Sequence, residues 1–241
     1  QSSTPLPREA FYRSNEKLEA AKAAYQAHLN RQRGNFEKNA EAAVRACETG
    51  LEGLAKDENA EIWAELQMYL GDAYSDLLRG GHANAATAAT RHYELAGTVF
   101  TRDERPLDWA EIQIGLGDIY SSQRGGDPHF GLQHALGLYR GALEVARQYG
   151  MTELECRVLD SIGSAYRHLG TSASDRDESI RYYEAALARR SPSEDIYEYV
   201  GTKLNLANVF CERPRGEEEL RRAIREYEEC LDLINASDSP S

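Results

Sequence analysis

The sequence WAELQMYLGDAY at residues 63–74 returns almost unchanged as WAEIQIGLGDIY at residues 109–120. Both copies contain a Leu-Gly pair followed by a tyrosine, and the pattern continues along the chain. The small residues that anchor it are separated by 46, 46 and 44 positions, and they are Gly71, Gly117, Gly163 and Ala207. Self-similarity at a fixed period is the mark of a repeat architecture. The sequence therefore contains at least four copies of one structural repeat.

A second phrase recurs in step with the first. Its tyrosines are spaced 46, 44 and 44 residues apart, at Tyr93, Tyr139, Tyr183 and Tyr227. Each has Ala or Ser four positions before it and Ala or Cys three positions after it. Small, aromatic and small residues at i, i+4 and i+7 lie on one stripe of a helix. Residues 8–55 resemble a fifth, degenerate copy, in which Cys47 stands at the tyrosine position.

Breakers separate the two amphipathic segments of each unit. Glycine ends a helix easily, and Asn, Asp or Ser begins the next one. The breakers occupy residues 79–84, 124–128, 170–177 and 212–216. No segment of useful length shows the alternation of a strand. The pattern predicts an all-α chain of about five helical hairpins, in which small residues let helices cross closely.

Composition favours a globular chain, since 41% of the residues are hydrophobic and 28% are charged. No run reaches the roughly 18 apolar residues of a membrane helix, and the first residues lack the order of a secretory signal. A cytoplasmic location is the expectation. We predict one helical repeat domain at residues 8–235, with flexible termini at 1–7 and 236–241. The chain begins at Gln1, which leaves open that flanking domains precede or follow it.

The net charge of −12 argues against nucleic acid and anionic membranes as partners. The densest basic run, Arg221–Arg225, has acids three and four residues away, which predicts ion pairs on a solvated helix face.

Catalytic and metal chemistry find little support in the sequence. The four cysteines form no CxxC pair, and Cys47 and Cys230 fall at apolar repeat positions. His129 and His134 lie near Asp127, but a spacing of five does not place both histidines on one helix face. No P-loop, GxSxG, HExxH or GxGxxG motif occurs. We expect no cofactor, no metal and no catalysis by this chain alone.

The phased Leu-Gly and tyrosine phrases resemble the tetratricopeptide repeat across residues 17–234. The resemblance implies helix-turn-helix units stacked into a right-handed α-solenoid. Two departures are a unit of 44 to 46 residues instead of about 34, and a missing proline at the usual place, although Pro106 and Pro192 lie in those connections. Long units of this kind are similar to the repeat arrays attached to bacterial and fungal signalling NTPases and caspase-like proteases.

The resemblance also implies which residues line the concave wall, because in that family the first helix of each unit does so at fixed offsets from the glycine. The residues expected to bind a partner are Glu65, Met68, Asp72 and Asp76 in one unit, Glu111, Ile114 and Asp118 in the next, and then Arg157, Arg167 and Asn208. Other positions at these offsets are Ser75, Ser121, Ser122, Asp160, Ser164, His168, Gly201, Leu204, Cys211 and Glu212. Asn208 also matches the place where some members hold a terminal carboxylate, but that clamp is incomplete here because its partner position is Ser164.

The expected function is protein interaction through this groove. Acidic residues dominate the first two sets, so we expect a peptide or protein partner with a basic segment, and an acidic residue near Arg157 and Arg167. Solvated charges without a ligand are the plain alternative. The second functional hypothesis is a sensor or regulatory arm of a larger signalling enzyme, an NTPase or a protease, whose catalytic domain lies outside this sequence. A helical enzyme with an unrecognised site is the third.

Overall fold

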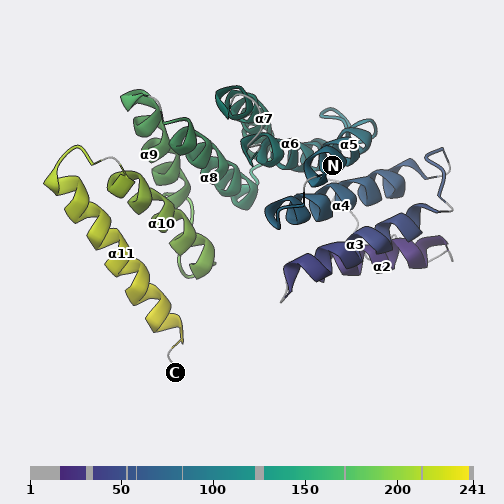
Figure 1. Cartoon of the computed structure of the whole chain (residues 1–241), viewed down its shortest axis with the longest axis horizontal. Helices are drawn as coiled ribbons and strands as arrows, with labels where there is room; N and C mark the ends of the chain where they lie inside the picture. The colour runs from purple at the N-terminus through teal and green to yellow at the C-terminus, as the bar shows by residue number, and fades with distance from the viewer. Residues whose placement is uncertain are drawn as a thin grey trace. The chain divides into compact units, whose positions relative to one another are not determined.

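The computed structural model describes residues 17–30, 35–52, 54–57, 59–82, 84–122, 128–170, 172–212 and 214–238. These residues form ten α-helices and no strand, as the stripes and breakers predict (Figure 1). None of the helices in these ranges is long and apolar enough to cross a membrane. The chain divides into two compact units, one within residues 1–119 and the other within residues 120–241.

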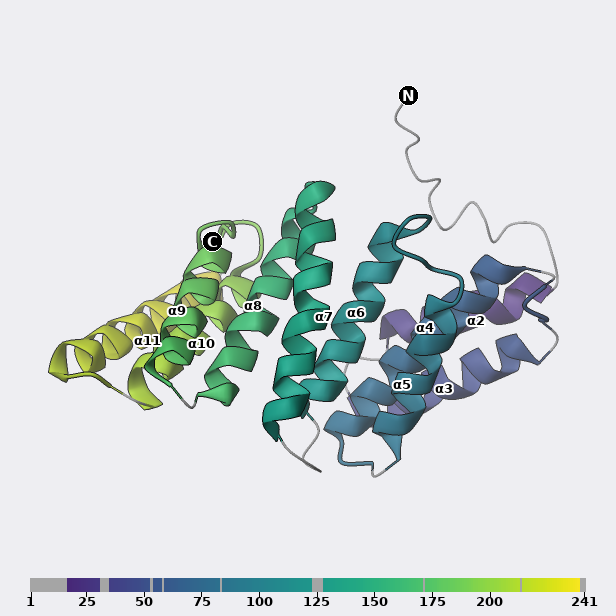
Figure 2. The same ribbon diagram turned by 90° about the horizontal axis from the view of Figure 1, so that it is seen from above.

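The first unit contains the N-terminal helices. They are α2 (Lys17–Asn30), α3 (Phe36–Leu51), α4 (Ala60–Arg79), α5 (Ala85–Gly97) and most of α6 (Pro106–Ser122). Helix α2 packs against α3, α3 against α4, and α4 against α5, while α2 also reaches α4. Figure 2 shows α2 to α5 lying side by side.

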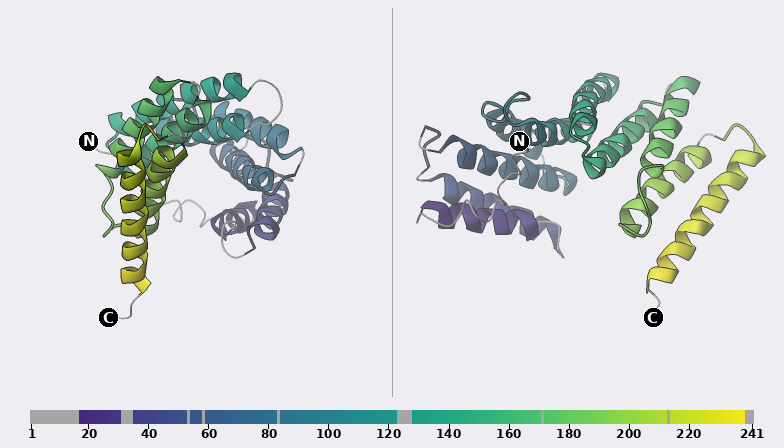
Figure 3. Two further views of the ribbon diagram at one scale, coloured as in Figure 1. Left: turned by 60° about the vertical axis from the view of Figure 1, so that its left-hand side comes forward. Right: turned by 180° about the vertical axis from the view of Figure 1, so that it is seen from behind.

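The second unit continues the same order of packing. Its helices are α7 (Pro128–Gln148), α8 (Thr152–Leu169), α9 (Ala173–Leu187), α10 (Ile196–Glu212) and α11 (Glu217–Asp238). Each of them packs against the one that follows it in the sequence (Figure 3). The strongest pairs, α8 with α9 and α10 with α11, are joined by short turns, as expected for helical hairpins.

Local sequence explains where the helices begin and end. The side chain of Asn59 accepts a hydrogen bond from the amide of Ile62 at 3.3 Å, and so caps α4. Gly170 ends α8 with φ of 42°, a conformation that glycine adopts without strain. Helix α9 begins at Ala173, inside the predicted breaker, because Ser172 and Asp175 form a capping box. The helix start expected further along therefore lies inside α9.

The predicted stripe of small and aromatic residues is buried in both units. In α5 the buried residues are Ala85, Ala89, Tyr93 and Ala96, and in α9 they include Ser179, Tyr183 and Ala186. The degenerate copy follows the rule, since Ala43, Cys47 and Gly50 are buried in α3. Burial raises the pKa of Cys47 to about 12, so its thiol stays protonated and packs as a small apolar group. Cys230 is also buried, as predicted.

Gly71 and Gly163 are the points where each first helix meets the tyrosine of its partner helix. A Cβ atom on Gly71 would lie 2.7 Å from the ring of Tyr93, and one on Gly163 would lie 2.9 Å from the ring of Tyr183. Both separations are shorter than real Cβ contacts. The same contact therefore occurs once in each unit, at equivalent positions of the repeat.

Tyr93 has a second glycine neighbour that the repeat did not predict. Gly115 of α6 faces the hydroxyl end of the Tyr93 ring, so closely that a Cβ atom there would overlap it. The ring thus lies between α4 and α6, and its exposed fraction is only 2%. The other sequence repeats have no glycine at the position of Gly115. They have Tyr69, Ser161 and Asn205 there.

The structure describes only part of the two termini predicted to be flexible. Residues 1–7, predicted to be flexible, lie outside the described residues, as do 239–241. Helix α11 continues to Asp238, beyond the predicted domain boundary at residue 235.

Replacing either contact glycine by alanine should destabilise the fold. Overpacking a filled interior costs about 1–3 kcal/mol, whereas alanine gains about 1 kcal/mol over glycine inside a helix. We expect Gly71→Ala and Gly163→Ala to lower the free energy of unfolding by up to about 2 kcal/mol, measured by urea denaturation with circular dichroism.

Gly137→Ala provides the matched control. Gly137 lies within α7, and a Cβ atom there would meet nothing within 4 Å. The free energy of unfolding should therefore rise by up to about 1 kcal/mol. A similar rise in all three variants would show that the tyrosine rings do not restrict the glycine positions.

Candidate functional site

The predicted wall residues of α4 differ widely in accessibility. Glu65, Met68 and Asp76 are buried, with exposed fractions of 8%, 7% and 3%. Asp76 accepts a hydrogen bond from Arg79 at 2.8 Å, one turn further along the same helix. Met68 belongs to the apolar core of the first unit. In this structure these three side chains offer little surface to a partner, whereas Asp72 is half-buried.

Asp72 is held by two neighbouring helices. Its Oδ1 accepts a hydrogen bond from the Tyr93 hydroxyl of α5 at 2.6 Å, and its Oδ2 lies 3.4 Å from Nδ1 of His28 on α2. Burial, together with the charge of Asp72, raises the pKa of Tyr93 well above its usual value. The phenol therefore remains a donor, and the carboxylate is its acceptor.

The wall residues of α6 are partly accessible. Glu111 and Asp118 are half-buried, and Ile114 is buried with an exposed fraction of 6%. Together with Asp72 they give the first unit three half-buried carboxylates at the predicted positions.

The second unit contains the remaining predicted residues. Arg157 is exposed on α8. Arg167, near the end of α8, lies 3.9 Å from a carboxylate oxygen of Glu212 and donates to Asn205 at 3.5 Å. Asn208 accepts a hydrogen bond from the Tyr227 hydroxyl at 2.6 Å. Asn208 thus repeats the role of Asp72, since both follow the small anchor residue and both accept from the tyrosine of the partner helix.

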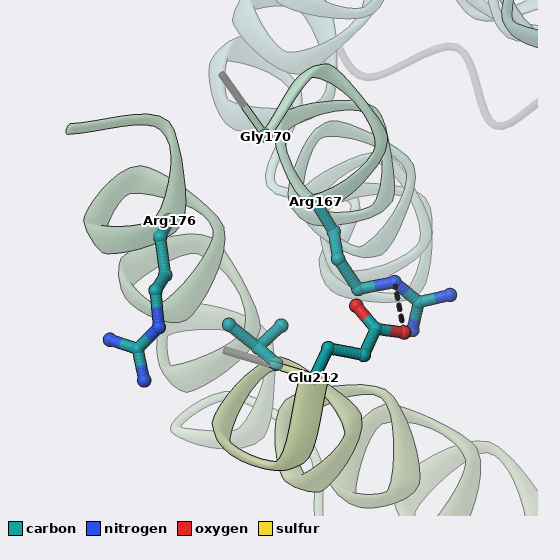
Figure 4. A pocket seen from close by; sticks show the side chains of 5 residues that line it. Arg167, Gly170, Arg176 and Glu212 are labelled. Atoms are coloured by element: carbon teal, nitrogen blue, oxygen red, sulfur yellow. Dashed lines mark ion pairs between the residues drawn. The ribbon is translucent and has the colours of Figure 1, made fainter. Parts of the chain in front are cut away.

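A small hollow lies where α8, α9 and α10 approach one another in the second unit (Figure 4). Its lining residues are Arg167, Gly170, Arg176, Val209 and Glu212, and its empty space of about 240 Å³ includes open solvent. Arg176 donates to Glu219 at 2.6 Å, and its guanidinium stacks 5.6 Å from the Phe210 ring. Both arginines therefore have carboxylate partners. The enclosed part of the hollow is also far too small for a small-molecule ligand.

A buried arginine network is the feature that sequence reasoning missed. Arg190 follows α9, and its side chain is only 5% exposed. It pairs with Asp160 of α8, donates to the hydroxyl of Thr202 on α10, and lies 3.3 Å from a carboxylate oxygen of Glu198. Burial raises the pKa of Asp160 to about 6, although Arg190 and Thr202 act in the opposite direction. The adjacent arginines at 189 and 190 gave no signal that one of them would turn inward.

The structure also shows the contacts of the predicted basic run, Arg221–Arg225, and of one histidine of the pair, His134. Arg221 pairs with Glu217 at 2.7 Å and Arg222 lies 3.7 Å from Glu226, which confirms ion pairs at a spacing of four residues, whereas Arg225 reaches Glu218, seven residues away, at 3.3 Å. The ring of His134 lies 4.3 Å from that of Tyr120. Asp127 lies outside the described residues, and within them no group of three or more His, Cys, Asp or Glu residues is placed to hold a metal ion.

Comparison with known protein families and with curated proteins gives no match to the chain.

Asp160 should make stability depend on pH. Its folded pKa of about 6 lies above the ordinary value of 3.8, so the folded chain binds this proton more tightly than the unfolded chain does. The resulting stabilisation is present below about pH 4 and is lost as the pH rises through 6. We expect the free energy of unfolding of the wild type, relative to Asp160→Asn, to fall between pH 4 and pH 7 by up to about 3 kcal/mol.

The measurement is urea denaturation of both chains at several pH values. Glu194→Gln, which neutralises an exposed carboxylate in the turn after Arg190, serves as the control. Its difference from the wild type should vary little over the same range. A flat difference for Asp160→Asn as well would contradict the raised pKa.

Proposed function

We propose that the chain is a non-catalytic protein-interaction module built from about five tetratricopeptide-like hairpins in a right-handed α-solenoid. The observation that supports this proposal most directly is the repeated contact of glycine and tyrosine, Gly71 with Tyr93 and Gly163 with Tyr183. Arrays of such units bind partners along an extended wall, because each unit contacts only its neighbours and leaves other positions available. A cytoplasmic location belongs to the same proposal.

The ligand we propose for the first unit is a basic peptide segment of another protein. Glu111 and Asp118 of α6 and Asp72 of α4 are half-buried carboxylates at wall positions. A net charge of −12 favours cationic ligands over nucleic acid or anionic membranes. Glu111 and Asp118 are seven residues apart on the same helix, α6, and so lie on one stripe, which makes them the strongest candidates for joint contact with the ligand. The exposed Arg157 in the second unit would receive an acidic residue.

Synthetic peptides of equal length that carry Lys, Glu or Ser between Ala and Leu positions provide the test. We expect the Lys peptides to bind most tightly by fluorescence anisotropy, with an affinity that falls as salt is added. Glu111→Lys with Asp118→Lys should weaken their binding about tenfold, which corresponds to about 1.4 kcal/mol.

The control reverses the same number of charges elsewhere in the unit. Glu94 lies on α5 and Glu104 precedes α6, and both are exposed. Glu94→Lys with Glu104→Lys should retain most of the affinity. Equal losses of peptide affinity in the two double variants would show that only the net charge matters. The α6 wall would then be rejected as the binding site. Circular dichroism of each variant, and the milder pair Glu111→Gln with Asp118→Asn, separate a binding defect from unfolding.

A further inference from the structure

Helix α11 carries three large aliphatic side chains that no part of the described chain covers. Leu220, Ile224 and Leu231 have exposed fractions of 38%, 54% and 63%. Spacings of four and seven residues place them on one stripe, which we name the outer face of α11. The stripe beside it, with Ala223 and Cys230, is buried, and α11 packs against α10.

The repeat shows what such a stripe does elsewhere in the second unit. Moving back 88 residues from the outer face gives Leu132, Leu136 and Leu143 of α7. Their exposed fractions are 5%, 4% and 6%, and α7 packs against α8, the helix that follows it.

Moving back 44 residues gives the equivalent stripe of α9. Ile180 and Leu187 there pack against the apolar cluster that contains Leu206, Val209 and Phe210 of α10. The third equivalent, Arg176, stacks on Phe210. The stripe is thus buried in α7, and in α9 its two aliphatic residues are partly buried against a cluster that includes three apolar side chains of α10, at i, i+3 and i+4.

Two acidic side chains, Glu228 and Asp232, border the outer face of α11. Glu228 lies four residues after Ile224 and three before Leu231, and Asp232 follows one turn later. Both carboxylates are exposed, and the structure pairs neither with a cationic side chain. Arginines occur only in the first half of α11, where Arg221 and Arg225 are already paired with glutamates. The C-terminal half of the face is therefore acidic along one border.

We propose that the outer face of α11 binds an amphipathic helix of another protein, with apolar residues at i, i+3 and i+4 and Lys or Arg along one edge. The apolar residues would occupy the place that Leu206, Val209 and Phe210 take against α9, and the basic edge would pair with Glu228 and Asp232. A contiguous stripe of exposed aliphatic side chains marks an interaction surface. This site is separate from the α6 wall.

The probe is a labelled 17-residue peptide derived from α10. It keeps Leu206, Val209 and Phe210 and carries Lys at the exposed positions, which are 197, 198, 204, 211 and 212. We expect this Lys peptide to bind the wild-type chain in fluorescence anisotropy. A Glu peptide, with Glu at the same positions, should bind at least fivefold more weakly, and a Ser peptide, with Ser in place of the three apolar residues, should not bind.

Variants of the chain locate the binding. Ile224→Glu with Leu231→Glu should weaken the Lys peptide at least tenfold, whereas Tyr197→Glu, an equally exposed apolar residue on α10, should leave its affinity unchanged. Glu228→Lys with Asp232→Lys should weaken the Lys peptide and strengthen the Glu peptide. Because all four positions are exposed, thermal unfolding by circular dichroism should match the wild type, and milder Ala substitutions replace any variant that does not.

Three outcomes would overturn the proposal. Equal binding of the Lys and Ser peptides would show that no apolar docking occurs. Loss of binding in Glu111→Lys with Asp118→Lys, but not in the α11 variants, would place the peptide on the α6 wall. A wild-type dimer in sedimentation equilibrium that Ile224→Glu with Leu231→Glu dissociates would assign the face to a second copy of this chain.

Discussion

The close approach of a glycine on one helix to a tyrosine ring on the next is the constraint on which the rest of each unit depends. At Gly71 and Gly163 the ring occupies the space that any side chain would need. The distance between the two helices is therefore set by the thickness of a ring, and their register by the one position that lacks a Cβ atom. Three mid-helix glycines at this repeat position each cost about 1 kcal/mol in helix propensity, which only tight packing offsets.

The same tyrosine links packing to the polar surface. Its ring is buried, but its hydroxyl must find an acceptor, because an unsatisfied buried donor costs about 1–3 kcal/mol. Asp72 accepts from Tyr93, and Asn208 accepts from Tyr227. The residue after each anchor, assigned to partner binding by the resemblance, thus also stabilises its hairpin. A charged ligand at Asp72 would therefore compete with the phenol for the same carboxylate.

The sequence was sufficient for features that depend on periodicity, and insufficient for those that depend on single side chains. Helix pairing, the buried stripe and the positions of Gly71 and Tyr93 follow from spacing alone. The start of α9 did not, because Ser172 and Asp175 form a capping box inside the predicted breaker at residues 170–177. The inward turn of Arg190 depends on where Asp160 and Thr202 lie in space, and nothing in their sequence positions connects them.

Burial also separated wall positions that the offsets treat alike. Met68 and Ile114 stand at the same offset and are both buried, whereas Leu204 at that offset is exposed. A side chain's neighbours on other helices decide this, and an offset within one helix contains no information about them. The acceptors of the Tyr93 and Tyr227 hydroxyls could have been found, since Asp72 and Asn208 are both polar at one repeat position, whereas Tyr139 contacts Ser121 instead.

Helices α7, α9 and α11 show how one repeat position serves different surroundings. In α7 the stripe consists of three buried leucines. In α9 it begins with Arg176, which is only 7% exposed and needs both the Phe210 ring and the Glu219 carboxylate to compensate its burial. In α11 that position is Leu220, so the stripe is wholly aliphatic again, as in α7. An arginine at that position would remain solvated without a partner. Three aliphatic side chains, in contrast, stabilise a structure only when another surface removes them from water. The composition of the outer face of α11 therefore matches a covered stripe more closely than a solvated one.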